Sequence, residues 1–297
     1  MANYVIITDS AADISAEQEK EWDTPIIKMS YLLNGTLYVN NPDHSELSVP
    51  EFYQILKNGA KASTSAINIG DFTDAFTPYL KDGKDVLYIG FSSGLSATYQ
   101  NAINAISELR EEFPDRKIEA VDSLCASFGQ GLLVYLCSEQ KKAGKTLDEV
   151  KAYAEQMRHK ICHEFTVDDL GQLKRGGRIS SAAAFFGSVL QIKPMLFVNE
   201  IGKLAAYDKV RSRRLSLAKL VDMIFAEISD DTSLPIFISH GDCEDDLHLV
   251  IAMLKEKLPK RKIITNYIGP VIGAHSGYKT LAIFCVGENR GDARVKE

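Results

Sequence analysis

The chain has 297 residues, of which 45% are hydrophobic and 25% are charged, and its formal net charge is −6. This length suits two packed domains of a soluble globular protein, and the acidic balance argues against indiscriminate nucleic-acid binding. The most apolar stretch, over 182–198, is interrupted by Gln191, Lys193 and Pro194, so we expect no stable membrane insertion.

The first residues and the cysteines indicate the compartment. The start of the chain carries no basic leader, and its apolar run is too short for a signal peptide. The five cysteines are odd in number and widely spaced, with no Cys-x-x-Cys, which favours reduced thiols buried in a core. We therefore expect a cytoplasmic protein.

Strand and helix patterns alternate along the chain. Apolar, β-branched runs predict strands over residues 4–7, 26–33, 86–91, 118–121, 192–198, 235–239, 263–268 and 281–286. Helical periodicity is clear over 99–113 and 147–161, and Ser15, Ser48 and Thr146 have the spacing of N-caps. The alternation predicts an α/β protein with two packed α/β domains, whose largely parallel sheets are flanked by helices.

The pattern shifts near residues 162–165, which suggests a domain boundary. We expect an N-terminal α/β domain over 1–164 and a C-terminal α/β domain over 165–297. No flexible linker separates them, so the two domains should pack closely. A crevice between two such domains is a common ligand site.

Two motifs that suggest nucleotides or metals have simpler explanations. Gly144-Lys145-Thr146 lacks the first glycine of a phosphate loop, because Glu139 stands there, and it follows a helical pattern. His159 and His163 are four apart and could share a helical face. Without a second ligand cluster they indicate a polar helix end, so no metal and no cofactor are expected.

Hydroxyl-rich turns follow several of the predicted strands. They are Thr8-Asp9-Ser10, Ser63-Thr64-Ser65, the Ser92–Ser96 turn, Asp122-Ser123 and His275-Ser276. Small hydroxyl groups and free amides at strand-to-helix junctions favour a bound carboxylate or phosphate. Each turn alone is explained equally well by ordinary turn chemistry. No pair of a nucleophile and its catalytic base is recognisable in the local sequence, so we expect anion binding without turnover.

Two basic clusters stand out in an acidic chain. One is the glycine turn that contains Arg178, and the other is the 209–214 segment that contains Arg211. A solvated basic face is the usual explanation, but such clusters also attract acidic or phosphate-bearing partners.

Taken together and in order, these motifs resemble those of the bacterial DegV family. The resemblance is carried by Thr8-Asp9-Ser10…Asp13, Thr64-Ser65, Ser92-Ser93-x-Leu95-Ser96-x-Thr98-Tyr99, Asp122-Ser123, Gly176-Gly177-Arg178, Lys193-Pro194 and Gly269-Pro-x-x-Gly273-x-His275-x-Gly277. It extends nearly from end to end. The family includes the fatty-acid-binding subunit of bacterial fatty acid kinase, which serves phospholipid synthesis.

The resemblance implies that this chain encloses one long-chain fatty acid between its domains and has no activity of its own. An ATP-dependent kinase subunit would phosphorylate the carboxylate. By position, the carboxylate-binding residues would be Thr64, Ser65, Ser93, Ser96 and His275. The N-terminal domain would carry the carboxylate-binding turns, and the C-terminal domain the acyl tunnel and the basic docking surface.

The tunnel wall and the docking surface are assigned to further residues. Phe185, Phe186 and Val189 would line the acyl tunnel, and Arg178 and Arg211 would dock the kinase. The chain departs from the usual family pattern at residues 66–67, 97 and 277–279, which leaves the preferred chain length and the partner open.

Two other functions fit the same residues. If Asp9, Ser96 and His275 converge in one cleft, the chain is a stand-alone hydrolase or phosphotransferase for a small anionic substrate. If no kinase partner exists, it is a regulatory binding protein.

Overall fold

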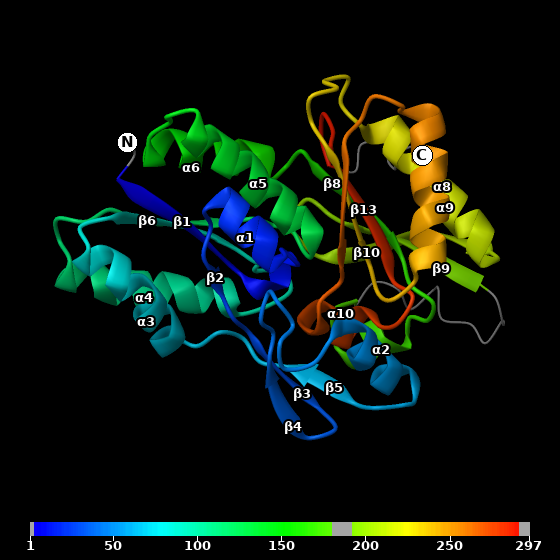
Figure 1. The fold of residues 1–297 in the computed structure, drawn as a ribbon, viewed down its shortest axis with the longest axis horizontal. Coiled ribbons are helices and arrows are strands. Elements are labelled where there is room, and N and C mark those ends of the chain that lie inside the picture. Colours follow the sequence, from blue (N-terminus) through cyan, green and yellow to red (C-terminus); the bar gives the residue numbers. More distant parts are fainter. Residues whose placement is uncertain (1–2, 180–191, 291–297) are drawn as a thin grey trace.

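The computed structural model describes residues 3–179 and 192–290 (Figure 1). The first layer is a four-stranded sheet in the order β2-β1-β6-β7, and all neighbours in it are parallel. Its strands are β1 (Tyr4–Asp9), β2 (Ile26–Ile27), β6 (Asp85–Gly90) and β7 (Ile118–Asp122). Since parallel strands end at the same edge, the hydroxyl-rich turns after β1 and β6 lie side by side.

The second sheet has six strands in the order β10-β9-β8-β13-β11-β12. They are β8 (Ile161–Thr166), β9 (Ile192–Val198), β10 (Leu204–Arg211), β11 (Ile236–His240), β12 (Ile263–Tyr267) and β13 (Leu281–Val286). Only β11 and β12 are parallel to each other. The α/β class is confirmed, but the expectation of largely parallel sheets holds only for the first sheet. The short loop between β9 and β10 is one reason, because so short a connection can only join antiparallel neighbours.

A third, small sheet is antiparallel throughout, in the order β4-β3-β5. Its strands are β3 (Ser30–Leu33), β4 (Thr36–Val39) and β5 (Ala62–Thr64). The single strand predicted over 26–33 is therefore two strands in two different sheets. Asn34 and Gly35 both have positive φ angles, of 50° and 85°, as a two-residue hairpin turn requires. That Asn-Gly pair is the signal from which the hairpin could have been predicted.

Helices cover both faces of the four-stranded sheet and the outer face of the six-stranded sheet (Figure 1). They are the 3-10 helix η1 (Ser10–Ala12), α1 (Ala16–Trp22), α2 (Val49–Lys57), α3 (Ile69–Lys81), α4 (Thr98–Glu112), α5 (Phe128–Lys142), α6 (Leu147–Met157), α7 (Gly171–Arg175), α8 (Arg213–Glu227), α9 (Glu244–Lys257) and α10 (Pro270–Ser276). The three N-caps predicted at Ser15, Ser48 and Thr146 are confirmed, each with a complete capping box. None of the described helices is long and apolar enough to cross a membrane.

The strand β8 corrects two expectations. Helix α6 ends at Met157, so His159 and His163 do not share a helical face; His163 lies on β8. The boundary expected between residues 164 and 165 falls inside this same strand, and the six-stranded sheet already begins at Ile161. Six consecutive buried residues in β8 form a strand held between β9 and β13. The apolar runs that predict the other strands do not mark this one, because His163 and Glu164 stand in the middle of it although both are buried.

Helix α5 lies between the two large sheets. Its residues from Phe128 to Val134 are all buried, as expected of a helix with protein on every side. Phe128 packs against Phe237 of β11 with 4.3 Å between ring centroids, and the same apolar cluster contains Leu87 of β6 and Phe284 of β13. One hydrophobic core is thus shared by both sheets. All five cysteines are buried and unbridged, as the sequence predicts.

We expect Phe128→Ala to lower the free energy of unfolding by about 3–5 kcal/mol, because it leaves a cavity at the centre of the shared core. Urea denaturation followed by circular dichroism measures this loss. Phe225→Ala is the matched control, since that ring is 50% exposed on α8. A cost below about 1 kcal/mol for Phe128→Ala would contradict a core shared through α5.

Candidate functional site

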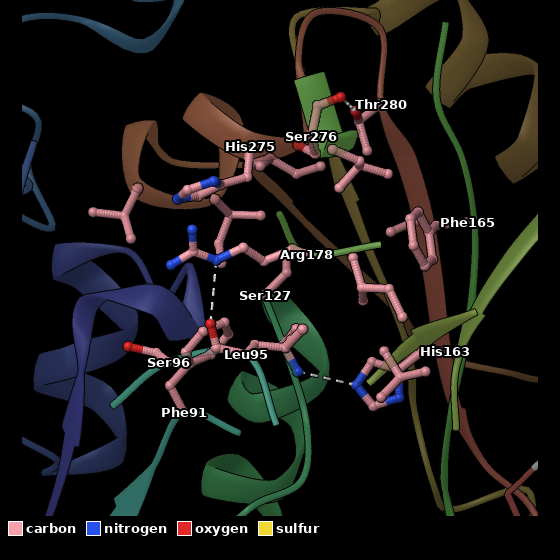
Figure 2. Close-up of a pocket in the computed structure, with 18 of the residues that line it drawn as sticks. Phe91, Leu95, Ser96, Ser127, His163, Phe165, Arg178, His275, Ser276 and Thr280 are labelled. Atoms are coloured by element: carbon pink, nitrogen blue, oxygen red, sulfur yellow. Dashed lines mark hydrogen bonds between the residues drawn. The ribbon is translucent and has the colours of Figure 1, made fainter. Parts of the chain in front are cut away.

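A cavity lies at the N-terminal end of α5, between the two large sheets (Figure 2). Its empty volume is about 750 Å³, part of which is open to solvent. Most of its lining is apolar: Met29, Phe91, Leu95, Ala126, Phe165, Leu173, Val198, Leu204, Ile268, Val271, Ile272, Ala282 and Phe284. The polar lining residues are Thr64, Ser96, Ser127, His163, Arg178, His275, Ser276 and Thr280. We call it the main cavity.

A buried carboxylate positions the turn that carries Ser96. Asp9, at the end of β1, accepts hydrogen bonds from the Tyr88 hydroxyl at 2.7 Å and from the Phe91 backbone amide at 2.9 Å. The Ser92 hydroxyl then donates to the Gly202 carbonyl, at 2.8 Å, in the loop between β9 and β10. The turn after β6 is therefore fixed to both large sheets.

Ser96 stands at the end of this turn, just before α4. Its Oγ lies 2.9 Å from Oγ1 of Thr98 and accepts the Thr98 backbone amide at 3.2 Å. Ser96 is half-buried and lines the main cavity. Its hydroxyl is therefore placed where a strand end and a helix start meet, as the sequence predicts.

Thr64 and His275 form a pair across the cavity mouth. Thr64 ends β5 and His275 lies on α10, and Thr64 Oγ1 is 2.7 Å from His275 Nε2. Gly176 packs against the same imidazole, because a Cβ on it would lie 2.5 Å from His275 Nδ1. The sequence therefore needs glycine at 176 for this close approach.

The His275 imidazole is neutral in this setting. Burial, together with the nearby Arg178 guanidinium, lowers its pKa to about 4. A neutral imidazole can donate one hydrogen bond and accept another. If Nε2 carries the proton and donates to Thr64, the Thr64 hydroxyl is left able to donate to a ligand oxygen. So low a pKa makes His275 a weak general base at neutral pH.

Arg178 lies at the cavity mouth beside His275 (Figure 2). Its Nε donates to the Leu95 carbonyl at 3.3 Å, and its Nη1 donates to the Gly176 carbonyl. The sequence predicted Arg178 for partner docking only. The structure also places its positive charge next to the Thr64–His275 pair, where it favours a bound anion.

Other predicted residues are not brought to the main cavity. Ser65 and Ser93 are exposed and are not among its lining residues. Ser65 follows Thr64 in an extended segment, where successive side chains point in opposite directions. Arg211 is exposed at the end of β10. Phe185, Phe186 and Val189 lie outside the described residues.

Asp9 does not join Ser96 and His275. It is fully buried and its carboxylate is occupied by the bonds that hold the turn after β6. The convergence on which the hydrolase alternative depends is therefore absent from the described residues. These residues also contain no group of three or more His, Cys, Asp or Glu that could hold a metal ion.

Four polar lining residues were missed by the sequence reasoning. His163 projects from β8, and its Nε2 accepts the Ala126 amide at 3.3 Å while its Nδ1 lies 3.0 Å from the Ile161 carbonyl. Ser127 precedes α5 with a φ of 54°. Ser276 and Thr280 lie together above the apolar part of the cavity (Figure 2). Ser276 stood in a recognised turn and His163 in the His159/His163 pair, but neither was assigned to the ligand site, and no pattern marked Ser127 or Thr280.

Comparisons with known proteins identify the family of this chain. A family model described as "Uncharacterised protein, DegV family" matches residues 3–288. The chain belongs to the DegV family. A DegV domain-containing protein of Clostridium perfringens is 44% identical over 290 residues, which covers 98% of this chain and 99% of the relative.

Solved structures of the family share the fold. A DegV family protein of Thermus thermophilus, whose structure is described as showing fatty acid binding, is 27% identical with a TM-score of 0.85. The alignment covers 96% of this chain and 99% of that one. DegV of Bacillus subtilis, described as a fatty acid binding protein, is 28% identical with a TM-score of 0.81, over 96% of this chain and all of the other.

We expect the His275 ring to stay neutral down to about pH 5 in the ligand-free protein, because its pKa is lowered to about 4. Proton–nitrogen correlation spectra of the imidazole, recorded from pH 4 to pH 8, measure this value. In Arg178→Gln the pKa of His275 should rise, because the substitution removes the positive charge that is one of the two causes of its low value. A His275 pKa above 6 in the unsubstituted protein would contradict the described environment.

Proposed function

We propose that this protein encloses one long-chain fatty acid in the main cavity and presents its carboxylate to a separate ATP-dependent kinase subunit. The observation that carries the proposal is an apolar cavity with Thr64, Ser96, Arg178 and His275 gathered at its mouth. The fatty acid binding described for relatives that are 27% and 28% identical supports the ligand class.

The two ends of the ligand have different roles in the proposal. Burying about 14 methylenes of a long tail contributes about 0.8 kcal/mol each, or about 11 kcal/mol before the costs of ordering. The tail therefore supplies most of the affinity. The carboxylate needs enough donors to avoid an unpaired buried charge, and the Ser96 and Thr64 hydroxyls are suited to this.

A groove on the outer side of the Thr64–His275 pair suits the partner. It shares Thr64, Arg178 and His275 with the main cavity, and it also contains Lys61 and Arg175. We propose that the kinase approaches along this groove, where three cations favour a phosphoryl donor. Arg178 would thus contact the carboxylate and face the partner, while Arg211 would extend the docking surface.

The ligand class is tested by mass spectrometry of an organic extract from the purified, denatured protein. We expect close to one fatty acid per chain, or uptake of one equivalent of added fatty acid. If nothing is bound and nothing is taken up, the carrier function is wrong.

The carboxylate site is tested by substitution. With a supplied fatty acid kinase subunit and ATP, Ser96→Ala and Thr64→Val should each lower the rate of acyl-phosphate formation at least tenfold. Ser65→Ala and Ser93→Ala are matched controls, because they remove the same groups outside the cavity, and they should change the rate less than twofold. Equal effects in all four variants would refute the assignment. Hydrolysis of acyl esters by the protein alone would instead support the stand-alone enzyme.

A further inference from the structure

A second cavity lies on the far side of Ser127 from the main cavity. It is bounded by η1 and the start of α1, by the loop after β4, and by the junction of β12 with α10, and its empty volume is about 720 Å³ including its opening. Its described lining contains Asp13, Glu17, Asn40 and Asp43, with no lysine or arginine among the described lining residues. The lining is therefore rich in hydrogen-bond acceptors and negative charge.

Asn40 has an amide oxygen without a partner in this cavity. Its side chain is 4% exposed, and Nδ2 donates to the Ser10 carbonyl at 3.0 Å. Because a carbonyl can only accept, this bond fixes which end of the amide faces Ser10. Oδ1 is left without a hydrogen-bond partner among the described residues. A buried hydrogen-bond acceptor that has no partner within the protein is stabilised when a bound molecule supplies a donor.

Asp13 faces the same point as Asn40. Its Oδ1 accepts the Gly269 amide at 2.9 Å, and its Oδ2 accepts the Ser127 hydroxyl. A Cβ on Gly269 would lie 3.0 Å from Asp13 Oδ1 and 3.3 Å from Asn40 Oδ1. The two oxygens therefore lie close to each other beside Gly269, on the side where a side chain would project.

The electrostatics of the second cavity favour a positive charge. Burial raises the pKa of Asp13 to about 8, which a neighbouring cation would reverse. Two carboxylates at the rim are ionised. A hydrogen bond from Ser15 lowers the pKa of Glu17. Hydrogen bonds from Ser45 lower the pKa of Asp43. His44 is neutral, because burial lowers its pKa.

We propose that the second cavity binds a small primary amine in its ammonium form, with the nitrogen between the Asp13 carboxylate and Asn40 Oδ1. Glu17 and Asp43 would hold the second ammonium group of a diamine. A primary ammonium has three donors and no acceptor, which matches a lining of acceptors. A metal ion fits less well, because the described residues contain no group of three or more His, Cys, Asp or Glu placed close enough to hold one.

The test is isothermal titration calorimetry of the full chain with butylamine and with 1,4-diaminobutane, using 1-butanol as the uncharged probe. We expect both amines to bind, the diamine at least tenfold more tightly, and butanol not to bind. Amine binding favours the ionised form of Asp13, whose pKa is about 8 without a ligand. About one proton should therefore be released for each amine bound at pH 7. At pH 9 Asp13 is already ionised, and the proton release should vanish. Absence of amine binding would overturn the proposal, as would tighter binding of Mg²⁺ or K⁺.

Substitutions locate the site. Asp13→Asn and Gly269→Ala should each weaken both amines at least tenfold; Gly269 has a φ of −67°, which alanine also adopts. Asp74→Asn on α3 is the matched control for charge. Glu17 and Asp43 are both exposed, so the double substitution Glu17→Gln with Asp43→Asn should not affect folding. It should remove the preference for the diamine and leave the affinity for butylamine unchanged. Equal binding in Asp13→Asn and Asp74→Asn would place the amine elsewhere and refute the site.

Discussion

Helix α5 must bury apolar side chains on all of its faces, and the two large sheets on either side of it satisfy that requirement. Because the helix separates the sheets, its N-terminal end leaves a space between them, lined by Ala126 and Ser127. The carboxyl ends of the parallel strands meet the same space. The cavity is therefore a consequence of how the core is shared, and the turns that follow β1 and β6 are brought to it by topology.

Within that cavity, the position of charge decides what can be bound. An apolar lining favours a hydrocarbon chain, but a carboxylate buried there needs compensation. Arg178 supplies a positive charge at the mouth while bonded to two backbone carbonyls, so its guanidinium is already oriented. The same charge helps to hold His275 neutral. The arrangement suits an anion held by hydrogen bonds at the mouth, with one side left toward the outer groove.

The sequence predicted the α/β class, the parallel core strands and three capped helices, because each depends on local patterns. The ordered motifs, through the family resemblance, also indicated Thr64, Ser96 and His275 as candidate site residues. The sequence patterns missed β8 and the mostly antiparallel second sheet, since strand pairing depends on residues far apart in the chain. Arg178 was assigned to an outer surface for the same reason. Its place beside His275 depends on the packing of α7 and α10, which no local pattern encodes.

Asp9 and Asp13 are four residues apart and both are buried, yet their surroundings differ. Asp9 accepts bonds from two backbone amides, a tyrosine hydroxyl and the Gln130 amide, so its acceptors are used within the fold. Asp13 has only Ser127 and Gly269 as donors among the described residues and faces the unpartnered oxygen of Asn40. A buried carboxyl with few donors costs stability unless something else compensates it. Since Ser127 also lines the main cavity, a ligand that ionised Asp13 would strengthen the bond from Ser127 and would act on the wall of the proposed fatty-acid site. By linkage, any such effect is reciprocal, and a bound fatty acid would change the affinity of the second cavity by the same factor.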